Sequence, residues 1–253
     1  MNKCWSSQPE AYWTHLSGQV EDMVRQHYNH PSIIFWSLTN EASNKATFDG
    51  TLAGQKVNEY RALIKSIDSE RLVGFVVAYS VNNPISYYGN PTVDWVGINS
   101  YTGWYTDKAS NDPTSHIETV QGNMSTLPLA LSEYGCGGTQ ECHSDTPDST
   151  TNKGSGGKRH DIEYMMWLHE GHLAAIRHKT ELMFTSMWVL FDFAVSSRVE
   201  GYKKCLDGIT AVSDNNLKYL NDKGLVERDH ITKKDTFYLY KAEWSSEKFV
   251  HIC

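Results

Sequence analysis

The sequence contains few cysteines, and they are widely scattered. Its 253 residues include five, at Cys4, Cys136, Cys142, Cys205 and Cys253. No pair has the close spacing of a zinc site, and the number is odd. We expect mostly reduced thiols, with a Cys136–Cys142 disulfide left open as an alternative. Reduced thiols favour a cytoplasmic location.

Long apolar runs and an excess of basic charge are also lacking. No run approaches the roughly 20 residues that span a bilayer, and the start of the chain lacks the apolar centre of a signal peptide. The 23 Lys and Arg are outnumbered by 30 Asp and Glu, which gives a net charge of -7. Because nucleic-acid binding needs a basic patch, we expect neither a membrane nor a nucleic acid as partner.

Aromatic side chains, by contrast, are abundant. The chain has 8 Trp and 14 Tyr. Such residues suit a cleft in which sugars stack on rings, although they also fill protein cores. The length is sufficient for one large α/β domain with a sizeable core.

Apolar runs alternate with amphipathic segments along the chain. We predict strands over residues 33–38, 72–78, 93–99, 129–133 and 182–191. We predict helices over residues 12–28, 53–67, 117–124, 161–179 and 234–244. Strands that are apolar throughout, with helices between them, indicate a parallel sheet whose outer face is covered. The repeat fits a (β/α)8 TIM barrel that is incomplete, because only five of eight strands are found.

Chemistry in such barrels lies at the carboxyl ends of the strands. The residues there are Asn40, Glu41, Tyr79, Asn99, Tyr101, Glu133 and 188–192. Burying a carboxylate is costly, so either Glu41 or Glu133 alone is most simply a salt-bridged structural acid. Two acids at neighbouring strand ends instead favour glycoside hydrolysis. That reaction needs one acid to protonate the leaving oxygen and another to attack or to activate water.

Several segments resemble glycoside hydrolase family 2, the family of β-galactosidases, β-glucuronidases and β-mannosidases. NHPSIIFWSLTNE resembles its acid/base segment, VDWVGINSYTGWY its sixth barrel strand and LPLALSEYGCGG its seventh. MWVLFDFAVSSRVEG is similar to the eighth strand, and NDKGLVERDHITKKDTFYLYKAEW to the closing loop and helix. The resemblance implies about strands four to eight of the barrel over residues 1–245. It also implies the start of a following β domain at 246–253, with truncation at both ends.

The resemblance also implies roles for single residues. Glu41 would be the general acid/base and Glu133 the nucleophile of a retaining mechanism. Asn40 would bind the sugar 2-hydroxyl, Tyr101 would steady the nucleophile, and Trp188 would form the floor of the sugar site. From the residues alone, Trp188 could instead be core filling, and Tyr101 could cap its strand through the hydroxyl; we favour the sugar-site role for both.

The sugar is less strongly indicated. Asn221 and Lys223 form an Asn-x-Lys triplet that in the family's β-glucuronidases holds the substrate carboxylate. The segments SEYGCGGTQECHSDTP and HDIEYMMWLHE look more like the β-galactosidase branch. We therefore expect hydrolysis of terminal β-D-galactosides. The alternatives are a β-glucuronidase, or a carbohydrate-binding or inactive fragment that lacks the first strands.

No metal or cofactor is expected. His169 and His172 in HEGHL lie three apart rather than the four of a metalloprotease helix. We interpret them as polar residues on the outer face of a barrel helix. The expected partner is a β-linked sugar, and homo-oligomer formation by a longer parent protein is left open.

Overall fold

The computed structural model describes residues 8–42, 48–105, 110–124, 126–145, 160–195 and 220–246. The chain divides into two compact units. The first unit contains residues up to 100 together with 115–132 and 181–185, and the second contains 101–114, 133–180 and the residues from 186 onward. Among the described residues, no helix is both long and apolar enough to cross a membrane.

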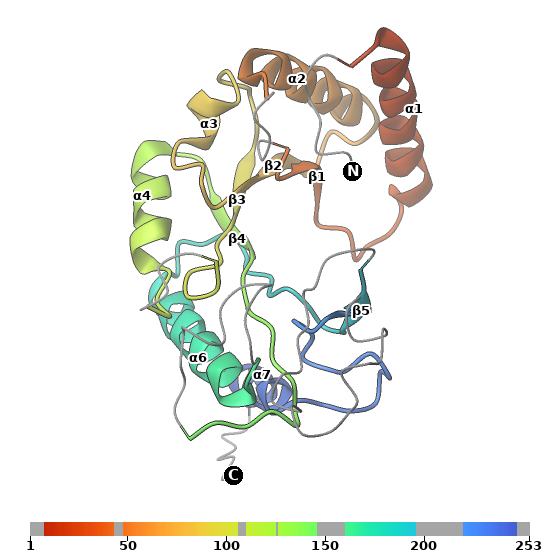
Figure 1. Cartoon of the computed structure of the whole chain (residues 1–253). Coiled ribbons are helices and arrows are strands. Elements are labelled where there is room, and N and C mark those ends of the chain that lie inside the picture. The colour runs from red at the N-terminus through yellow and green to blue at the C-terminus, as the bar shows by residue number, and fades with distance from the viewer. Residues whose placement is uncertain are drawn as a thin grey trace. The chain divides into compact units, whose positions relative to one another are not determined.

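The first unit is built from repeated strands and helices. Its helices are α1 (Glu10–His27), α2 (Gly50–Ile67), α3 (Pro84–Tyr87) and α4 (Thr114–Met124). Its strands are β1 (Phe35–Asn40), β2 (Leu72–Ala78), β3 (Trp95–Asn99) and β4 (Leu129–Glu133), which crosses into the second unit at its last residue. These strands form one sheet in the order β1-β2-β3-β4, and the β1–β2 and β2–β3 pairs are parallel (Figure 1). This confirms the α/β class and the incomplete barrel.

Four of the five predicted strands and all five predicted helices lie close to their expected positions. The first strand begins two residues later than predicted, because Ile34 is 75% exposed and Phe35 is the first residue in register with β2. It also ends later, at Asn40, and Glu41 N donates to Val76 O at 3.1 Å just beyond it. The short helix α3 was not predicted. Asn83 caps its start, with a side-chain oxygen that accepts from Ser86 N.

Helix α2 shows why the local sequence forms these elements. Asp49 caps its start, with a side-chain oxygen accepting from Leu52 N at 3.1 Å. Such a cap satisfies a backbone donor that has no partner within the helix. Its buried residues recur every three or four positions, which places them on one face: Ala53, Gly54, Val57, Tyr60 and Ile64. Tyr60 contacts the neighbouring helix, donating its hydroxyl to Trp13 O in α1 at 3.3 Å.

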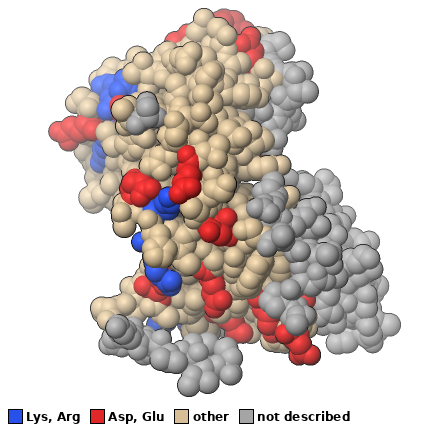
Figure 2. All heavy atoms as spheres, turned by 90° about the vertical axis from the view of Figure 1, so that its left-hand side faces the viewer, with Lys and Arg blue, Asp and Glu red and all other residues tan. Residues whose placement is uncertain are grey.

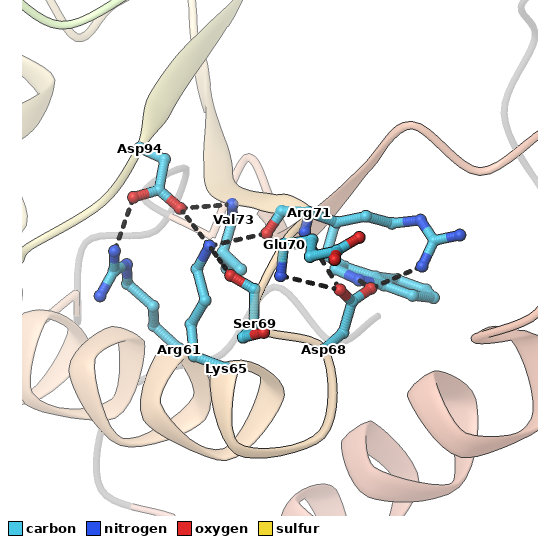
Figure 3. A network of polar contacts seen from close by, with 9 residues as sticks. Arg61, Lys65, Asp68, Ser69, Glu70, Arg71, Val73 and Asp94 are labelled. Carbon is cyan, nitrogen blue, oxygen red and sulfur yellow. Dashed lines mark hydrogen bonds and ion pairs between the residues drawn. The ribbon is translucent and has the colours of Figure 1, made fainter.

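An ionic network holds α2 to the beginnings of two strands (Figure 3). Asp94 accepts from Arg61 at 2.6 Å, lies 3.3 Å from Lys65 Nζ and accepts from Val73 N at 2.8 Å. One carboxylate thus joins two helical cations to the first part of β2. A backbone N–H at a strand end would otherwise lack a protein partner.

Asp68 organises the other half of this network (Figure 3). It is 1% exposed and accepts from Trp36 Nε1 at 2.9 Å and from Arg71 Nη1 at 2.7 Å. Burial by itself would raise the pKa of Asp68, but the hydrogen bonds from Arg71 and Trp36 outweigh burial and lower the pKa to about 2. The carboxylate therefore stays ionised and joins α2 to β1 and β2.

The core of the first unit is aromatic and aliphatic. Val76, Trp95 and Ala130 are buried together, and Phe35, Met183 and Phe184 pack against them. The rings of Phe35 and Phe184 stack with centroids 4.5 Å apart, and Trp95 meets Phe35 edge-on at 5.0 Å. The segment 181–185 therefore supplies core side chains even though it is not a strand.

The predicted strand over 182–191 is wrong. Its first part forms an isolated parallel bridge with β4, in which Met183 N donates to Leu129 O and Leu131 N to Phe184 O. Its later part bonds other segments: Trp188 N donates to Tyr134 O, and Val189 N to Lys223 O. Because the backbone divides its hydrogen bonds among several partners, no continuous ladder forms.

The second unit contains two helices and a short antiparallel pair. The helices are α6 (Ile162–His178) and α7 (Asp235–Trp244), and the strands are β5 (Phe193–Ala194) and β6 (Leu220–Asn221). Acidic and basic side chains are interspersed on the face of the molecule drawn in Figure 2. The expected start of a following domain at 246–253 lies, apart from residue 246, outside the described residues.

The cysteines correct one expectation. Cys142 is disulfide-bonded, whereas Cys136 is a free and fully buried thiol. The Cys136–Cys142 disulfide is therefore excluded, and the prediction of mostly reduced thiols fails for Cys142. The cytoplasmic expectation loses the part of its support that came from reduced thiols. Burial, followed by the negative charge of Asp222, raises the pKa of Cys136 well above its ordinary value, so this thiol stays protonated.

Candidate active site

Glu41 lies directly after β1 in the first unit. Its φ of 51° is in the left-handed region, which is uncommon for a residue with a side chain. Its side chain is partly buried and accepts through Oε1 from Asn99 Nδ2 at 3.1 Å. Asn40 precedes it, is exposed, and accepts through Oδ1 from the same Asn99 nitrogen at 2.9 Å. Asn99 therefore ties Asn40, the last residue of β1, and Glu41, the residue after it, to the end of β3.

Asn99 is in turn held by β4. Ser132 Oγ donates to Asn99 Oδ1 at 2.9 Å, and Asn99 is completely buried. A β-carbon on Gly97 would lie 2.7 Å from that serine oxygen, so a glycine at this position allows β3 and Ser132 to approach. Asn99 is predicted at a strand end from its position in the sequence, but its partners depend on which strand ends meet in the folded sheet.

Glu133 ends β4 and belongs to the second unit. Tyr101 donates its hydroxyl hydrogen to Glu133 Oε2 at 2.7 Å, and the tyrosine is 6% exposed. A short hydrogen bond from a phenol orients a carboxylate and stabilises its ionised form. The structure thus joins these two residues by a direct hydrogen bond from the Tyr101 hydroxyl.

Aromatic rings connect Tyr101 to a buried cation. Tyr101 meets Tyr105 edge-on, with centroids 5.1 Å apart. Lys223 Nζ lies 5.6 Å from the Tyr105 ring centroid and 5.7 Å from that of Trp104. Lys223 is only 2% exposed, and ring faces attract a cation that has lost contact with water. Lys223, Tyr105, Tyr101 and Glu133 therefore form a continuous series of contacts.

The Asn-x-Lys triplet is itself firmly held. Asn221 Oδ1 accepts from Lys223 N at 3.1 Å, and Asn221 is paired in register with Phe193. Asp222, between them, accepts from His160 Nδ1 at 2.5 Å. Burial would raise the pKa of Asp222, but the charge and hydrogen bond of His160 outweigh burial and lower it. All three side chains of the triplet are thus buried, and those of Asn221 and Asp222 are held by hydrogen bonds.

Trp188 lies beside the residue that follows Glu133. Its backbone N donates to Tyr134 O at 2.8 Å, and its partly buried ring meets Phe193 edge-on at 5.9 Å. Gly135 has a φ of 134°, and a β-carbon there would lie 2.9 Å from Trp188 O. Only glycine adopts this conformation readily and leaves room for the tryptophan backbone. The Trp188 backbone is therefore held against Tyr134 and Gly135, the two residues that follow Glu133, and its ring is only partly buried.

A buried lysine joins the loop after β4 to the triplet. Lys234 is completely buried, and its Nζ donates to Gly138 O at 2.7 Å, Asp222 O at 2.8 Å and Asp192 Oδ1 at 2.8 Å. Burial raises the pKa of Asp192 to about 7, although Lys234 acts in the opposite direction. This crosslink was not predicted, because Lys234 looks like a surface residue at the start of a helix.

The interpretation of HEGHL as an outward-facing polar pair is wrong. His169 and His172 are both completely buried. His169 Nδ1 is 2.8 Å from the Tyr240 hydroxyl, and the His172 ring stacks on Tyr134 at 5.3 Å. Burial lowers the pKa of His169 to about 3, so its ring is neutral. Among the described residues, no group of three His, Cys, Asp or Glu is arranged to hold a metal ion.

The predicted site residues fall into two sets. Asn40 and Glu41 belong to the first unit, whereas Tyr101, Glu133, Trp188, Asn221 and Lys223 belong to the second. Each set gathers its members through direct contacts or shared backbone hydrogen bonds. Chemically, the first set offers a carboxyl group beside an amide. The second offers a carboxylate with a phenolic donor, partly buried rings and a buried cation.

Comparison with known proteins places this arrangement in a family. The family model described as "Glycosyl hydrolases family 2, TIM barrel domain" matches residues 2–246. The Bacteroides fragilis β-glucuronidase is 30% identical over 91% of this chain and 29% of its own length. The Homo sapiens β-glucuronidase is 32% identical over 51% of this chain and 19% of its own length.

Solved structures agree. The FMN-binding β-glucuronidase of Facaelibacterium prausnitzii L2-6 superposes with a TM-score of 0.76 at 25% identity, over 95% of this chain and 33% of that one. A Bacteroides uniformis β-glucuronidase gives a TM-score of 0.72 at 26% identity, over 95% of this chain and 27% of that one. The chain thus spans about a third of these structures or less. Because the family match extends over residues 2–246, the chain belongs to the glycosyl hydrolases of family 2, as part of their TIM barrel domain.

Proposed function

We propose that this barrel belongs to a retaining glycosidase that hydrolyses β-linked uronides. Glu133 is the nucleophile and Glu41 the general acid/base. The observation that carries the proposal is the series of contacts from buried Lys223 through Tyr105 and Tyr101 to Glu133. Through two aromatic rings, this series links a buried positive charge to the carboxylate to which we assign the attack on the sugar.

The proposed reaction has two displacements. Glu133 attacks the anomeric carbon while Glu41 gives its proton to the glycosidic oxygen, so that the carbon–oxygen bond breaks and the aglycone leaves as an alcohol. Glu41 then removes a proton from water. The water attacks the same carbon and releases Glu133 from its ester. The Tyr101 hydrogen bond keeps Glu133 ionised and oriented before the attack.

The two sets of polar residues take complementary parts in binding. Asn40 donates to the sugar 2-hydroxyl, a contact that strengthens in the transition state. Lys223 and Asn221 bind the carboxylate of a uronic acid, and Trp188 stacks on the sugar ring. A lysine that is 2% exposed gains more from an anion than from a neutral hydroxymethyl group, because charge attraction is stronger where water is excluded. The relatives named β-glucuronidase support the same choice.

A β-galactosidase is the second candidate, supported by the segments 132–147 and 160–170. Kinetics with nitrophenyl β-glucuronide and nitrophenyl β-galactoside separate the two. We expect the purified protein to prefer the glucuronide. Lys223→Met should lower kcat/KM for the glucuronide by about 100-fold, since losing a charged hydrogen bond costs about 1.5–3 kcal/mol. The galactoside value should stay within a few fold.

Lys233→Met is the matched control. Lys233 is an exposed cation that lies 5.1 Å from the Phe237 ring centroid, and its removal should change neither substrate's kinetics. A wild-type preference for the galactoside would overturn the uronide assignment. A carbohydrate-binding or inactive fragment would bind sugar without turnover, and neither Glu41→Gln nor Glu133→Gln would change its behaviour.

A further inference from the structure

The amide of Asn99 joins the two residues that end β1. Its single nitrogen lies 2.9 Å from Asn40 Oδ1 and 3.1 Å from Glu41 Oε1. We propose that Asn99 is a positioning residue with two effects. It selects which oxygen of Glu41 holds the transferable proton, and it sets the direction of the Asn40 amide. The proposal rests on the role of Glu41 as acid/base.

The orientation of the Asn99 amide follows from its three partners. An ionised carboxylate has no hydrogen to donate, so Glu41 must face the amino group of Asn99. That group has two hydrogens, one for Glu41 and one for Asn40. Ser132 Oγ is a donor and completes the arrangement by bonding the opposite side of the amide, Oδ1, at 2.9 Å. Rotating the Asn99 amide by half a turn would instead place its oxygen opposite Asn40 Oδ1 and Glu41 Oε1, which are both acceptors.

The consequence for Glu41 is a difference between its two oxygens. Oε1 accepts from Asn99 in both protonation states, provided that the proton is on Oε2. A proton on Oε1 would instead point an O–H donor at the N–H donor of Asn99, and the hydrogen bond would be lost. Asn99 therefore directs the proton to Oε2, which becomes the oxygen that gives it to the leaving group and later recovers one from water.

The consequence for Asn40 is a fixed direction of donation. Its Oδ1 is occupied by Asn99, so its amino group is on the opposite side of the amide from Asn99. Asn40 is exposed at the end of its strand, where substrate has access to it. One buried amide thus fixes both the proton donor and the proposed donor to the sugar 2-hydroxyl.

The sheet explains how Asn99 reaches across. β2 lies between β1 and β3, so the Asn99 side chain must pass over it. The register partner of Asn99 on β2 is Ala78, the last residue of that strand. Paired residues in a sheet point to the same face, so only a methyl group lies beside Asn99 on the way to β1. A larger residue at 78 would occupy this path.

Carboxyl-carbon NMR of Glu41 tests the proposal without requiring activity. In Asn99→Ala, the titration midpoint of Glu41 should rise by about one pH unit, because a donor that favours the ionised form is removed. Ser132→Ala should give a smaller rise, since it removes only the anchor of the amide. Ser132→Ala alone decides the question if Asn99→Ala does not fold. Thr39→Val is the control. It removes a buried hydroxyl of β1 that donates at 3.5 Å to Val76 O, the carbonyl that also accepts from Glu41 N, and it leaves the contacts of the Glu41 carboxyl group in place, so the midpoint should not move.

An unchanged midpoint in the folded Asn99 and Ser132 variants, or an equal rise in Thr39→Val, would overturn the proposal.

Kinetics add a readout that a merely structural role would not move. Asn99→Ala should lower kcat/KM by about tenfold more for substrates with poor leaving groups than for dinitrophenyl glycosides, which need little acid assistance. If the midpoint moves but even Glu41→Gln shows no dependence on the leaving group, the acid/base assignment fails instead. If Glu41→Gln shows that dependence but the midpoint of Glu41 is unchanged in Asn99→Ala, the positioning role of Asn99 fails.

Discussion

Tyr101 donates a hydrogen bond to Glu133 Oε2 at 2.7 Å. Glu133 is the last residue of β4, and Tyr101 follows the end of the neighbouring strand β3. The tyrosine is almost fully buried, so the contact is shielded from water. A phenol in this position sets the orientation of the carboxylate and favours its charged form.

Tyr101→Phe should lower kcat by about 10- to 100-fold, because a hydrogen bond to a charged group contributes about 1.5–3 kcal/mol. Steady-state kinetics with an aryl glycoside measure the loss. Tyr164→Phe is the control: Tyr164 is also buried in the second unit, but its hydroxyl donates to Gly103 O at 2.6 Å. We expect that variant to lose stability and to keep its kcat. Equal losses of kcat in both variants would contradict a role for Tyr101 at the nucleophile.

Azide should distinguish the two glutamates by the product that it forms. In Glu133→Gly, azide replaces the nucleophile and attacks the substrate once, so an α-glycosyl azide should form from an activated β-glycoside. In Glu41→Gly, azide attacks the glycosyl-enzyme instead and should give the β-anomer. Proton NMR of the product reads the configuration. The opposite pairing of variant and anomer would reverse the assigned roles.

Acid should destabilise the second unit through His169. The pKa of this buried ring is lowered to about 3 from an ordinary 6.5, so the unfolded chain binds a proton more readily than the folded one between these values. Its contribution to stability is complete above pH 6.5 and decreases by up to about 1.4 kcal/mol per pH unit as pH falls toward 3. Denaturant unfolding from pH 7 to 4 measures this slope.

His169→Asn should flatten that dependence, since it has no ring to protonate and can still bond the Tyr240 hydroxyl. His178→Asn, at an exposed position of the same helix, should leave the slope as in the wild type. If the His169 variant kept the full slope, other buried groups would have to account for it.

The stabilising contribution of Asp68 to the first unit should persist to a lower pH than that of His169 to the second. Its pKa is about 2 in the fold against an ordinary 3.8, so its contribution is present above pH 3.8 and is lost as pH falls through 2. Asp68→Asn should therefore destabilise the protein by about 2 kcal/mol at neutral pH. The difference from wild type should shrink toward pH 2. Glu70→Gln, an exposed neighbour drawn in Figure 3, should cause little change at either pH.

The sequence analysis succeeded where the signal was local. Helix α2 was predictable because a cap at Asp49 precedes an apolar stripe with helical spacing. β1 to β4 were predictable because each is an apolar run bounded by polar residues. The segment 182–191 has the same appearance, yet it bonds β4 at one end and the Lys223 segment at the other. Strand formation depends on a continuous partner, and no property of the segment itself supplies one.

The side chains of the site divide in the same way. Their positions and the resemblance to a family singled out these candidate residues: Asn40, Glu41, Tyr101, Glu133, Trp188, Asn221 and Lys223. The burial of His169 and the crosslink by Lys234 were not predicted, because a polar residue in a helical pattern looks exposed unless its partners are known. The same holds for Asn99, whose importance lies entirely in what it contacts.

The sequence by itself predicted four strands and five helices in their order and, through the resemblance of its motifs, the family. It also singled out Glu41 and Glu133 as the candidate acids, because each follows an apolar run of residues. Only the tertiary structure decided which polar groups meet. Ser132 from β4, Asn99 from β3 and Glu41 after β1 are 33 to 91 positions apart (132 − 99 and 132 − 41) and are joined only when parallel strands align their ends. Hydrogen bonds of about 3 Å require that alignment, and it arises from packing of the whole sheet rather than from any one segment.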